Sequence, residues 1–100
     1  MTEKEYRKYN FVEKDMLGED VKPGDLVILN GYMAVPYVGM VSHKVASGNT
    51  AILTAWRPWN ECYYSWSYRS LDRVIKVSGN KYDSLQKSLK KALEKYRKNG

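Results

Sequence analysis

Apolar residues near the C-terminus recur at intervals of three, four and seven positions. They are Tyr82, Leu85, Leu89, Ala92, Leu93 and Tyr96. This spacing places them on one face of an α-helix, with polar residues on the other faces. Asn80 or Asp83 can cap the N-terminus of this helix, and Lys95 and Lys98 suit the negative end of its dipole. The pattern therefore predicts an amphipathic C-terminal helix.

The middle of the chain consists of short runs rich in β-branched and aromatic residues, separated by turn signals. Runs of this length and composition are typical of strands. They are Leu26–Leu29, Val38–Val45, Thr50–Ala55, Glu61–Tyr68 and Arg73–Val77. A wide loop is expected before the second run, because Pro36 has no N–H for a strand ladder. Ser70-Leu71-Asp72 predicts one tight helical turn before the last strand.

Two of the predicted strands have faces that differ in kind. Alternation places Val41, His43 and Val45 on one face of the second strand, with Gly39 near its start as a site for a bend or bulge. In the fourth strand one face is rich in aromatic residues and is the candidate for burial. Its members are Cys62, Tyr64, Trp66 and Tyr68.

The N-terminal segment, residues 1–20, has a weaker pattern. Thr2 and Glu5 have the spacing of a capping box, which predicts the start of a short helix. The apolar residues that follow are expected to dock this helix or arm on the core. They are Phe11, Val12, Met16 and Leu17.

Two short motifs resemble a known group of folds. Lys22–Val27 reads K-P-G-D-L-V and Val38–Val41 reads V-G-M-V. They resemble the G-D-x-V and G-x-V pattern of KOW, Tudor-like and other SH3-like barrels, and the chain is also similar to small accessory proteins of tailed bacteriophages. The resemblance implies a mainly β, single-domain fold. Residues 21–78 would form a five-stranded SH3-like barrel, with the arm 1–20 before it and a basic helix over 79–100 packed on it.

The net charge of +6 is unevenly distributed. Residues 1–20 carry −2, residues 21–78 carry +3 and residues 79–100 carry +5. A basic end on a small domain can hold phosphate backbones or an acidic protein surface, and it is also a common solubility device.

The cysteine and histidine content and the absence of known motifs limit the functions that the chain can have. Cys62 is the only cysteine, which excludes an internal disulfide and favours a reducing cytoplasm. Residues 2–8 have no apolar stretch of a secretory signal, and no run of the chain is apolar enough to cross a membrane. One histidine, His43, and one cysteine fall short of a metal site, and no nucleotide-binding glycine motif is present. We therefore expect neither catalysis nor a cofactor.

The stretch from Trp56 to Arg69 holds six of the thirteen aromatic residues and two of the five arginines. Exposed aromatic rings stack on bases, and nearby cations hold the phosphate backbone. The candidate binding residues are Trp56, Arg57, Trp59, Tyr63 and Arg69 in this stretch, Tyr32 and Tyr37 in the first loop, and Lys87, Lys90, Lys91 and Lys98 in the helix. The competing interpretation is that the tryptophans cover one end of a barrel and the lysines only solvate the helix.

These residues predict a cytoplasmic, non-catalytic module that binds RNA or DNA with weak sequence preference. The alternative is a protein-interaction module, because Trp, Tyr and Arg are also the usual hot-spot residues of protein interfaces. Its partner would be an acidic host protein, and the phage resemblance implies a modulator or inhibitor of a host enzyme, acting in the host cytoplasm.

Overall fold

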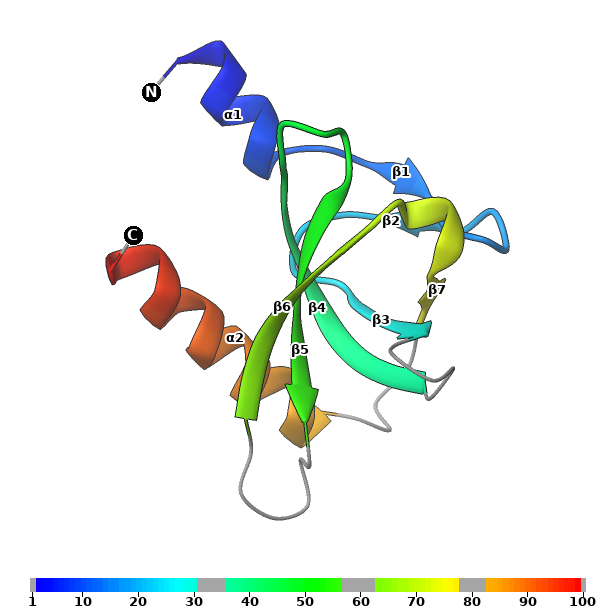
Figure 1. Cartoon of the computed structure of the whole chain (residues 1–100), viewed down its shortest axis with the longest axis vertical. Helices are drawn as coiled ribbons and strands as arrows, with labels where there is room; N and C mark the ends of the chain where they lie inside the picture. Colours follow the sequence, from blue (N-terminus) through cyan, green and yellow to red (C-terminus); the bar gives the residue numbers. More distant parts are fainter. Residues whose placement is uncertain (1, 31–35, 57–62, 78–82, 100) are drawn as a thin grey trace.

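A computed structural model describes residues 2–30, 36–56, 63–77 and 83–99 of the chain. Figure 1 shows a twisted sheet with a helix near each end of the chain. The elements in order are α1 (Glu3–Tyr9), β1 (Glu13–Lys14), β2 (Asp20–Val21), β3 (Leu26–Asn30), β4 (Pro36–Lys44), β5 (Thr50–Trp56), β6 (Tyr63–Arg69), the 3-10 helix η2 (Leu71–Arg73), β7 (Ile75–Lys76) and α2 (Asp83–Asn99). The predicted mainly β fold with a C-terminal helix is confirmed.

The main sheet has five antiparallel strands in the order β6-β5-β4-β3-β7. Consecutive strands β3 to β6 are neighbours, and the last strand returns to pair with β3, where Val27 lies opposite Lys76. The predicted tight turn is η2, which comes directly before β7. A second sheet, the two-stranded N-terminal hairpin of β1 and β2, was not predicted.

Strand β4 owes its shape to a glycine and a bulge. A Cβ on Gly39 would lie 2.6 Å from Cγ2 of Ile52, so only glycine allows β5 to approach this closely. The register shifts between Val41 and His43, which lie opposite Ile52 and Ala51. The prediction that Val41 and His43 share a face is therefore wrong, because the bulge adds one residue between them.

Apolar residues form a core on each face of the sheet. One cluster comprises Val21, Val27, Leu29, Val41, Ile52, Leu71 and Val74. The other comprises Leu26, Met40, Leu53, Ala55, Leu89 and Leu93, so it joins the sheet to α2. Leu89 is fully buried and Leu93 is 3% exposed, and each such side chain contributes about 1.5 to 3 kcal/mol. The apolar stripe predicted for the C-terminal helix is thus its docking face.

The aromatic face of β6 is only partly buried. Tyr64 and Trp66 pack against the cluster beneath α2, as expected. Tyr68 is 49% exposed, so the expected burial is wrong at this end of the strand, where its cross-strand neighbour is the small Ala51. Cys62 lies outside the described residues.

The N-terminal helix begins as predicted. The Thr2 hydroxyl oxygen accepts a hydrogen bond from the Glu5 N–H at 3.2 Å. Of the four apolar residues expected to dock this segment, only Phe11 packs against a core cluster. Val12, Met16 and Leu17 are 63%, 55% and 67% exposed, so that part of the prediction is wrong.

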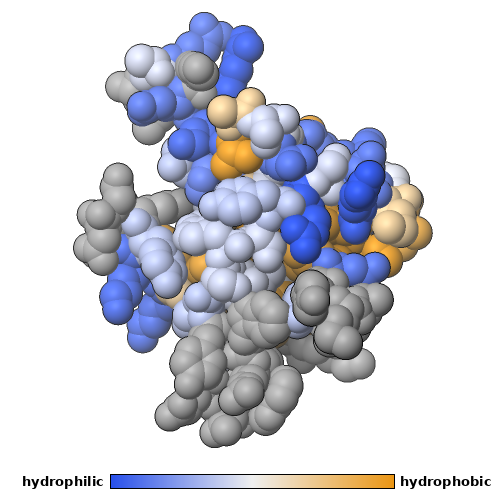
Figure 2. Space-filling model, viewed as in Figure 1, coloured by the Kyte–Doolittle hydropathy of each residue, from blue (hydrophilic) through white to orange (hydrophobic). Residues whose placement is uncertain are grey.

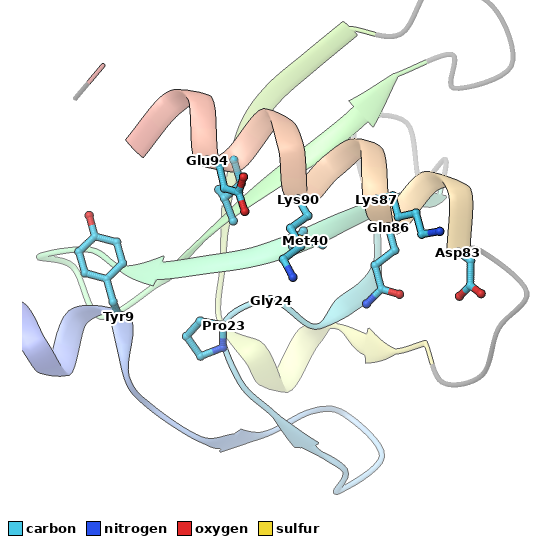
Figure 3. Close-up of a pocket in the computed structure, with 10 residues that line it drawn as sticks. Tyr9, Pro23, Gly24, Met40, Asp83, Gln86, Lys87, Lys90 and Glu94 are labelled. Carbon is cyan, nitrogen blue, oxygen red and sulfur yellow. The ribbon is translucent and has the colours of Figure 1, made fainter. Parts of the chain in front are cut away.

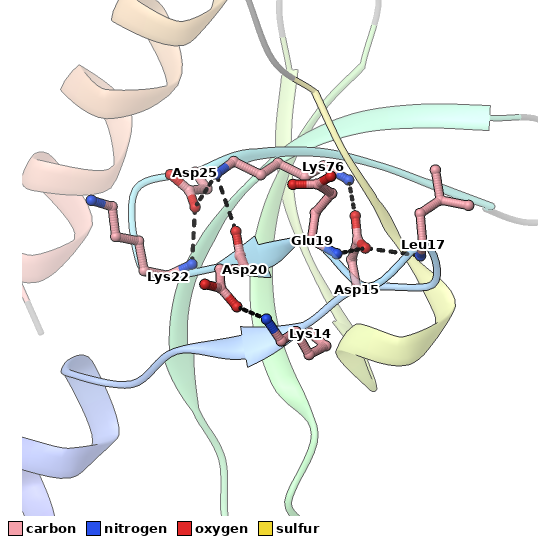
Figure 4. A network of polar contacts seen from close by, with 8 residues as sticks. All are labelled: Lys14, Asp15, Leu17, Glu19, Asp20, Lys22, Asp25 and Lys76. Atoms are coloured by element: carbon pink, nitrogen blue, oxygen red, sulfur yellow. Dashed lines mark hydrogen bonds and ion pairs between the residues drawn. The ribbon is translucent and has the colours of Figure 1, made fainter.

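A buried carboxylate helps to fasten the N-terminal hairpin to the sheet (Figure 4), in addition to the buried Val21 of β2. Asp15 is 5% exposed, and its oxygens accept hydrogen bonds from the backbone N–H groups of Lys76 at 2.7 Å, Glu19 at 2.8 Å and Leu17 at 2.9 Å. These bonds, with that from Lys76 the strongest, lower the pKa of Asp15 although burial acts to raise it. The turn that carries Met16 and Leu17 is therefore fixed through a polar anchor.

Candidate functional site

The structure separates the two ends of the predicted aromatic and arginine tract. Trp56 lies opposite Tyr63 at one end of the β5–β6 pair, while Arg69 lies opposite Thr50 at the other. Six residues of extended strand span roughly 20 Å. Arg57, Trp59 and Tyr32 lie outside the described residues, as do the side chains of Trp56, Tyr63 and Lys98.

Two predicted binding residues make contacts within the fold. The Arg69 guanidinium donates hydrogen bonds to the carbonyl oxygens of Tyr68 at 2.9 Å and Asn30 at 3.2 Å, so it connects the end of β6 to the end of β3. Tyr37 pairs with Leu29 and packs against the core cluster on the face away from α2. Neither residue is among the described residues that line the pockets along α2 with Lys87, Lys90 and Lys91.

The solvent side of α2 carries four exposed lysines, Lys87, Lys90, Lys91 and Lys95, which we call the lysine ridge. Three of these, Lys87, Lys90 and Lys91, were predicted as binding residues. Among the described residues none of the four takes part in an ion pair. Their charges are therefore available to a ligand, and the ridge lies between two grooves that run along α2.

The first groove, the aromatic groove, lies between α2 and β6 and has a volume of about 470 Å³. Two tyrosines and two lysines supply most of its lining. The lining residues are Tyr64, Ser88, Lys91, Ala92, Lys95 and Tyr96. No described residue of this lining carries a carboxylate, so the groove combines aromatic surface with positive charge alone.

The second groove, the mixed-charge groove, lies between α2 and the turn that precedes β3, and its volume is about 660 Å³ (Figure 3). Met40 and Leu93 contribute apolar surface, and Lys87 and Lys90 contribute positive charge. Figure 3 shows Tyr9 at one end of this groove and Asp83 at the other. The negative charges of Asp83 and Glu94 balance the positive charges of the two lysines, so the groove is formally neutral.

Aromatic rings from four elements form a continuous row beside the aromatic groove. The ring of Trp66 lies 5.9 Å from that of Tyr96 and 5.5 Å from that of His43, and the His43 ring lies 5.3 Å from that of Tyr9. We call these four residues the aromatic row. In Figure 2 residues of intermediate hydropathy, drawn in pale tones, cover the middle of the visible face between blue hydrophilic groups.

Sequence patterns missed Tyr9, His43 and Tyr96 as members of one surface. They come from α1, β4 and α2, and the β4 bulge turns His43 toward the face of Met40. Tyr96 was predicted only as part of the helix core, yet it is 45% exposed. Its position at the C-terminal end of the apolar stripe was the one available signal.

His43 is held within this row. Its Nδ1 lies 2.8 Å from the Ser42 hydroxyl, in addition to its two ring contacts. Within residues 2–30, 36–56, 63–77 and 83–99, no group of three or more His, Cys, Asp or Glu side chains has the arrangement of a metal site. The environment of His43 is that of an aromatic packing partner.

Comparisons with protein-family models, with curated proteins and with solved structures gave no match. In the described part of the chain, no helix combines the length and the apolar content needed to cross a membrane. Proposals about function therefore rest on the chain's own residues and their geometry.

Proposed function

We propose that this protein is a non-catalytic module that binds RNA or DNA with weak sequence preference. The contact is made by the aromatic groove, including the two lysines of the ridge that line it, Lys91 and Lys95. The observation that carries the proposal is the lining of the aromatic groove, in which Tyr64 and Tyr96 lie beside Lys91 and Lys95 without an opposing carboxylate among the described residues.

This lining matches the two needs of a nucleic-acid strand. Stacking of a base on an aromatic ring stabilises a complex by about 1 to 3 kcal/mol and depends little on the base. Each lysine that neutralises a phosphate of a single strand changes the slope of log affinity against log salt by about −0.7. Lys91 and Lys95 should therefore contribute a slope of about −1.4.

For the fold, we propose a small SH3-like barrel. The strand order β6-β5-β4-β3-β7 and the 3-10 turn before the last strand support this assignment. The hydrogen bond from Arg69 to the Asn30 carbonyl also supports it, because it connects strands that are not neighbours in the sheet. Such closure removes exposed strand edges and gives α2 a rigid base.

Titration of labelled single strands and duplexes at about 50 and 200 mM salt tests the proposed function. We expect binding that weakens with salt and keeps a residual affinity from stacking. Lys91→Ala/Lys95→Ala should lower affinity roughly 20-fold near 0.1 M salt, from two lost phosphate contacts. The matched control is Lys14→Ala/Lys22→Ala, which removes the same charge from exposed positions outside the groove. Equal losses in the two variants would refute the site, and no binding by the unmodified protein would refute the function.

A second function is favoured by a separate observation. Val12, Met16 and Leu17 are exposed on a segment that Asp15 anchors firmly, and exposed apolar side chains of this kind mark protein interfaces. We propose, as the alternative, a module that binds a host protein through the exposed apolar side chains of this segment. A partner that survives nuclease treatment in a pull-down, and is lost with Leu17→Ser but kept with Lys91→Ala/Lys95→Ala, would support this function over the first.

A further inference from the structure

The aromatic row ends at Tyr9, which lies at one end of the mixed-charge groove, and the neighbouring Lys8 lines a second cationic pocket. This pocket, the α1 pocket, has a volume of about 410 Å³ and is lined by Arg7, Lys8, Lys44, Val45 and Ala46. No described residue of this lining carries a carboxylate. The pocket therefore offers positive charge with a small apolar surface at the far end of the row.

The cations of the α1 pocket differ in whether they are paired with a carboxylate. Arg7 pairs with Glu3 at 2.6 Å, and Lys44 pairs with Glu13. Lys8 has no ion pair among the described residues, and its Nζ lies 5.7 Å from the centre of the Tyr9 ring. Lys8 is thus the cation of this pocket best able to meet a phosphate, and it lies next to the last ring of the row.

Ring contacts, completed by Lys8 beside Tyr9, connect the two cationic sites. Tyr96 belongs both to the aromatic groove and to the row, and Tyr9 joins the row to α1. The three successive ring centres are 5.3 to 5.9 Å apart, with interplanar angles of 43°, 68° and 64°. The tilted rings meet edge to face, so each contact covers part of one ring face. Tyr96 is 45% exposed and the other three residues of the row are half-buried, so Tyr96 offers the most open ring.

We propose that a single unpaired nucleic-acid strand crosses this surface from the aromatic groove to the α1 pocket. The inference rests on the proposed function and specifies its ligand. Bases of a duplex are stacked on one another, so only an unpaired strand can place base faces against protein rings while its phosphates reach lysines at both ends. A duplex would meet the lysine ridge alone.

The distance between the two ends sets a minimum strand length. A short strand fills the aromatic groove only, whereas a longer one also reaches Lys8. Site sizes of small folds that bind single strands run from roughly 4 to 16 nucleotides, so the gain in affinity should appear within this range. Loss of the Lys8 contact should lower the affinity of the long strands only.

The test uses the full chain and labelled strands of uniform sequence, DNA and RNA, from below about 4 to about 16 nucleotides. In the unmodified protein we expect affinity to rise with length and then level off. Lys8→Ala should weaken the binding of strands long enough to reach Lys8 about threefold to fivefold near 0.1 M salt. The affinities of shorter strands and of duplexes should not change. Lys14→Ala, which also removes one exposed lysine, should leave every length unchanged.

Tyr9→Leu gives a second measure, because it keeps an apolar side chain at the end of α1 and removes the ring. It should reproduce the length-dependent loss of Lys8→Ala. If strands bind through Lys91 and Lys95 but neither variant affects any length, the path is wrong and the proposed function stands. If no strand binds at any length, both are wrong. DNA and RNA of equal length should behave alike, since the proposed contacts involve base faces and phosphates.

Discussion

The two grooves along α2 share a wall and differ in charge. Both are bordered by lysines of the same ridge, Lys91 and Lys95 on one side and Lys87 and Lys90 on the other. The mixed-charge groove is the larger, at about 660 Å³ against about 470 Å³, yet Asp83 and Glu94 oppose its lysines. A polyanion would be repelled by those carboxylates, so size is the wrong guide to the nucleic-acid site.

The difference between the grooves arises from the positions of residues around one helix. Asp83, Lys87, Lys90 and Glu94 recur at intervals of four, three and four, which places them on one side of α2. Lys91 and Lys95 are four residues apart and lie on the other side, toward the aromatic residues of β6. Among the described residues that line the two grooves, the lysines of α2 are therefore without neighbouring carboxylates on one flank only, and this is the flank that we propose for a polyanion.

The largest expected effect comes from removing the anchor that both grooves share. Leu89 is fully buried between α2 and the sheet, so Leu89→Ala should lower the free energy of unfolding by about 2 to 5 kcal/mol. Chemical denaturation followed by tryptophan fluorescence would measure it. The control is Ser88→Ala at an exposed position, which should change stability little. A loss below about 1 kcal/mol for Leu89→Ala would mean that α2 does not depend on this contact.

A smaller loss of stability should come from the face of the sheet away from both grooves. A Cβ on Gly39 would lie 2.6 Å from Ile52 Cγ2 and 3.1 Å from the Leu53 carbonyl oxygen, so Gly39→Ala forces β4 and β5 apart. We expect a cost of about 1 to 3 kcal/mol in the same denaturation experiment. Gly48→Ala is unsuitable as a control because its φ is +89°, whereas Ala46→Gly changes an exposed position outside the sheet.

Replacing the ring of Tyr96 should then show which of the two grooves binds a single strand. Tyr96→Leu keeps an apolar contact with Trp66 but removes the stacking surface, so affinity for a single strand should fall about fivefold or more, from about 1 kcal/mol of lost stacking. Gln86→Leu, in the mixed-charge groove, is the matched change and should have little effect. Fluorescence anisotropy with one labelled strand measures both. Equal losses would remove the distinction between the grooves.

The smallest effect is expected on changing Asp15 in the N-terminal hairpin, because this residue lines neither groove. Because its folded pKa is lowered, Asp15 stabilises the protein above its unfolded pKa of about 3.9, and this contribution disappears as pH falls through the folded value. Asp15→Asn should therefore lower the midpoint of thermal unfolding by about 4 to 8 °C at neutral pH, and by less at about pH 3. Asp20→Asn, at an exposed carboxylate paired with Lys14, should change the midpoint little.

Strong periodicity predicted much of this fold from sequence. The stripe of Leu85, Leu89 and Leu93 was enough to identify α2 and its buried face, because burial of that stripe is what holds the helix. Turn signals at Pro23-Gly24 and Ser47-Gly48 bounded strands that the structure confirms. The N-terminal hairpin was missed because its strands have two residues each and are held by Asp15 and the buried Val21, and single anchoring residues give no periodic signature.

The candidate site was only partly accessible from sequence. Lys87, Lys90 and Lys91 were predicted from charge, but net charge alone does not tell which lysines share their side of the helix with carboxylates. The aromatic row depends on a bulge that brings His43 to the face of Met40, and on contacts between residues as distant as Tyr9 and Tyr96. Alternation along a strand predicted the opposite face for His43.

The central claim is that the aromatic groove, and not the lysine ridge as a whole, binds nucleic acid. The most direct measurement compares Lys91→Glu/Lys95→Glu with Lys87→Glu/Lys90→Glu for one labelled single strand in one buffer. Both variants lower the net charge equally and alter exposed positions of the same helix. We predict that the first loses at least about tenfold more affinity than the second, because it places carboxylates where phosphates bind. Equal losses would show a nonspecific effect of charge and would contradict the account.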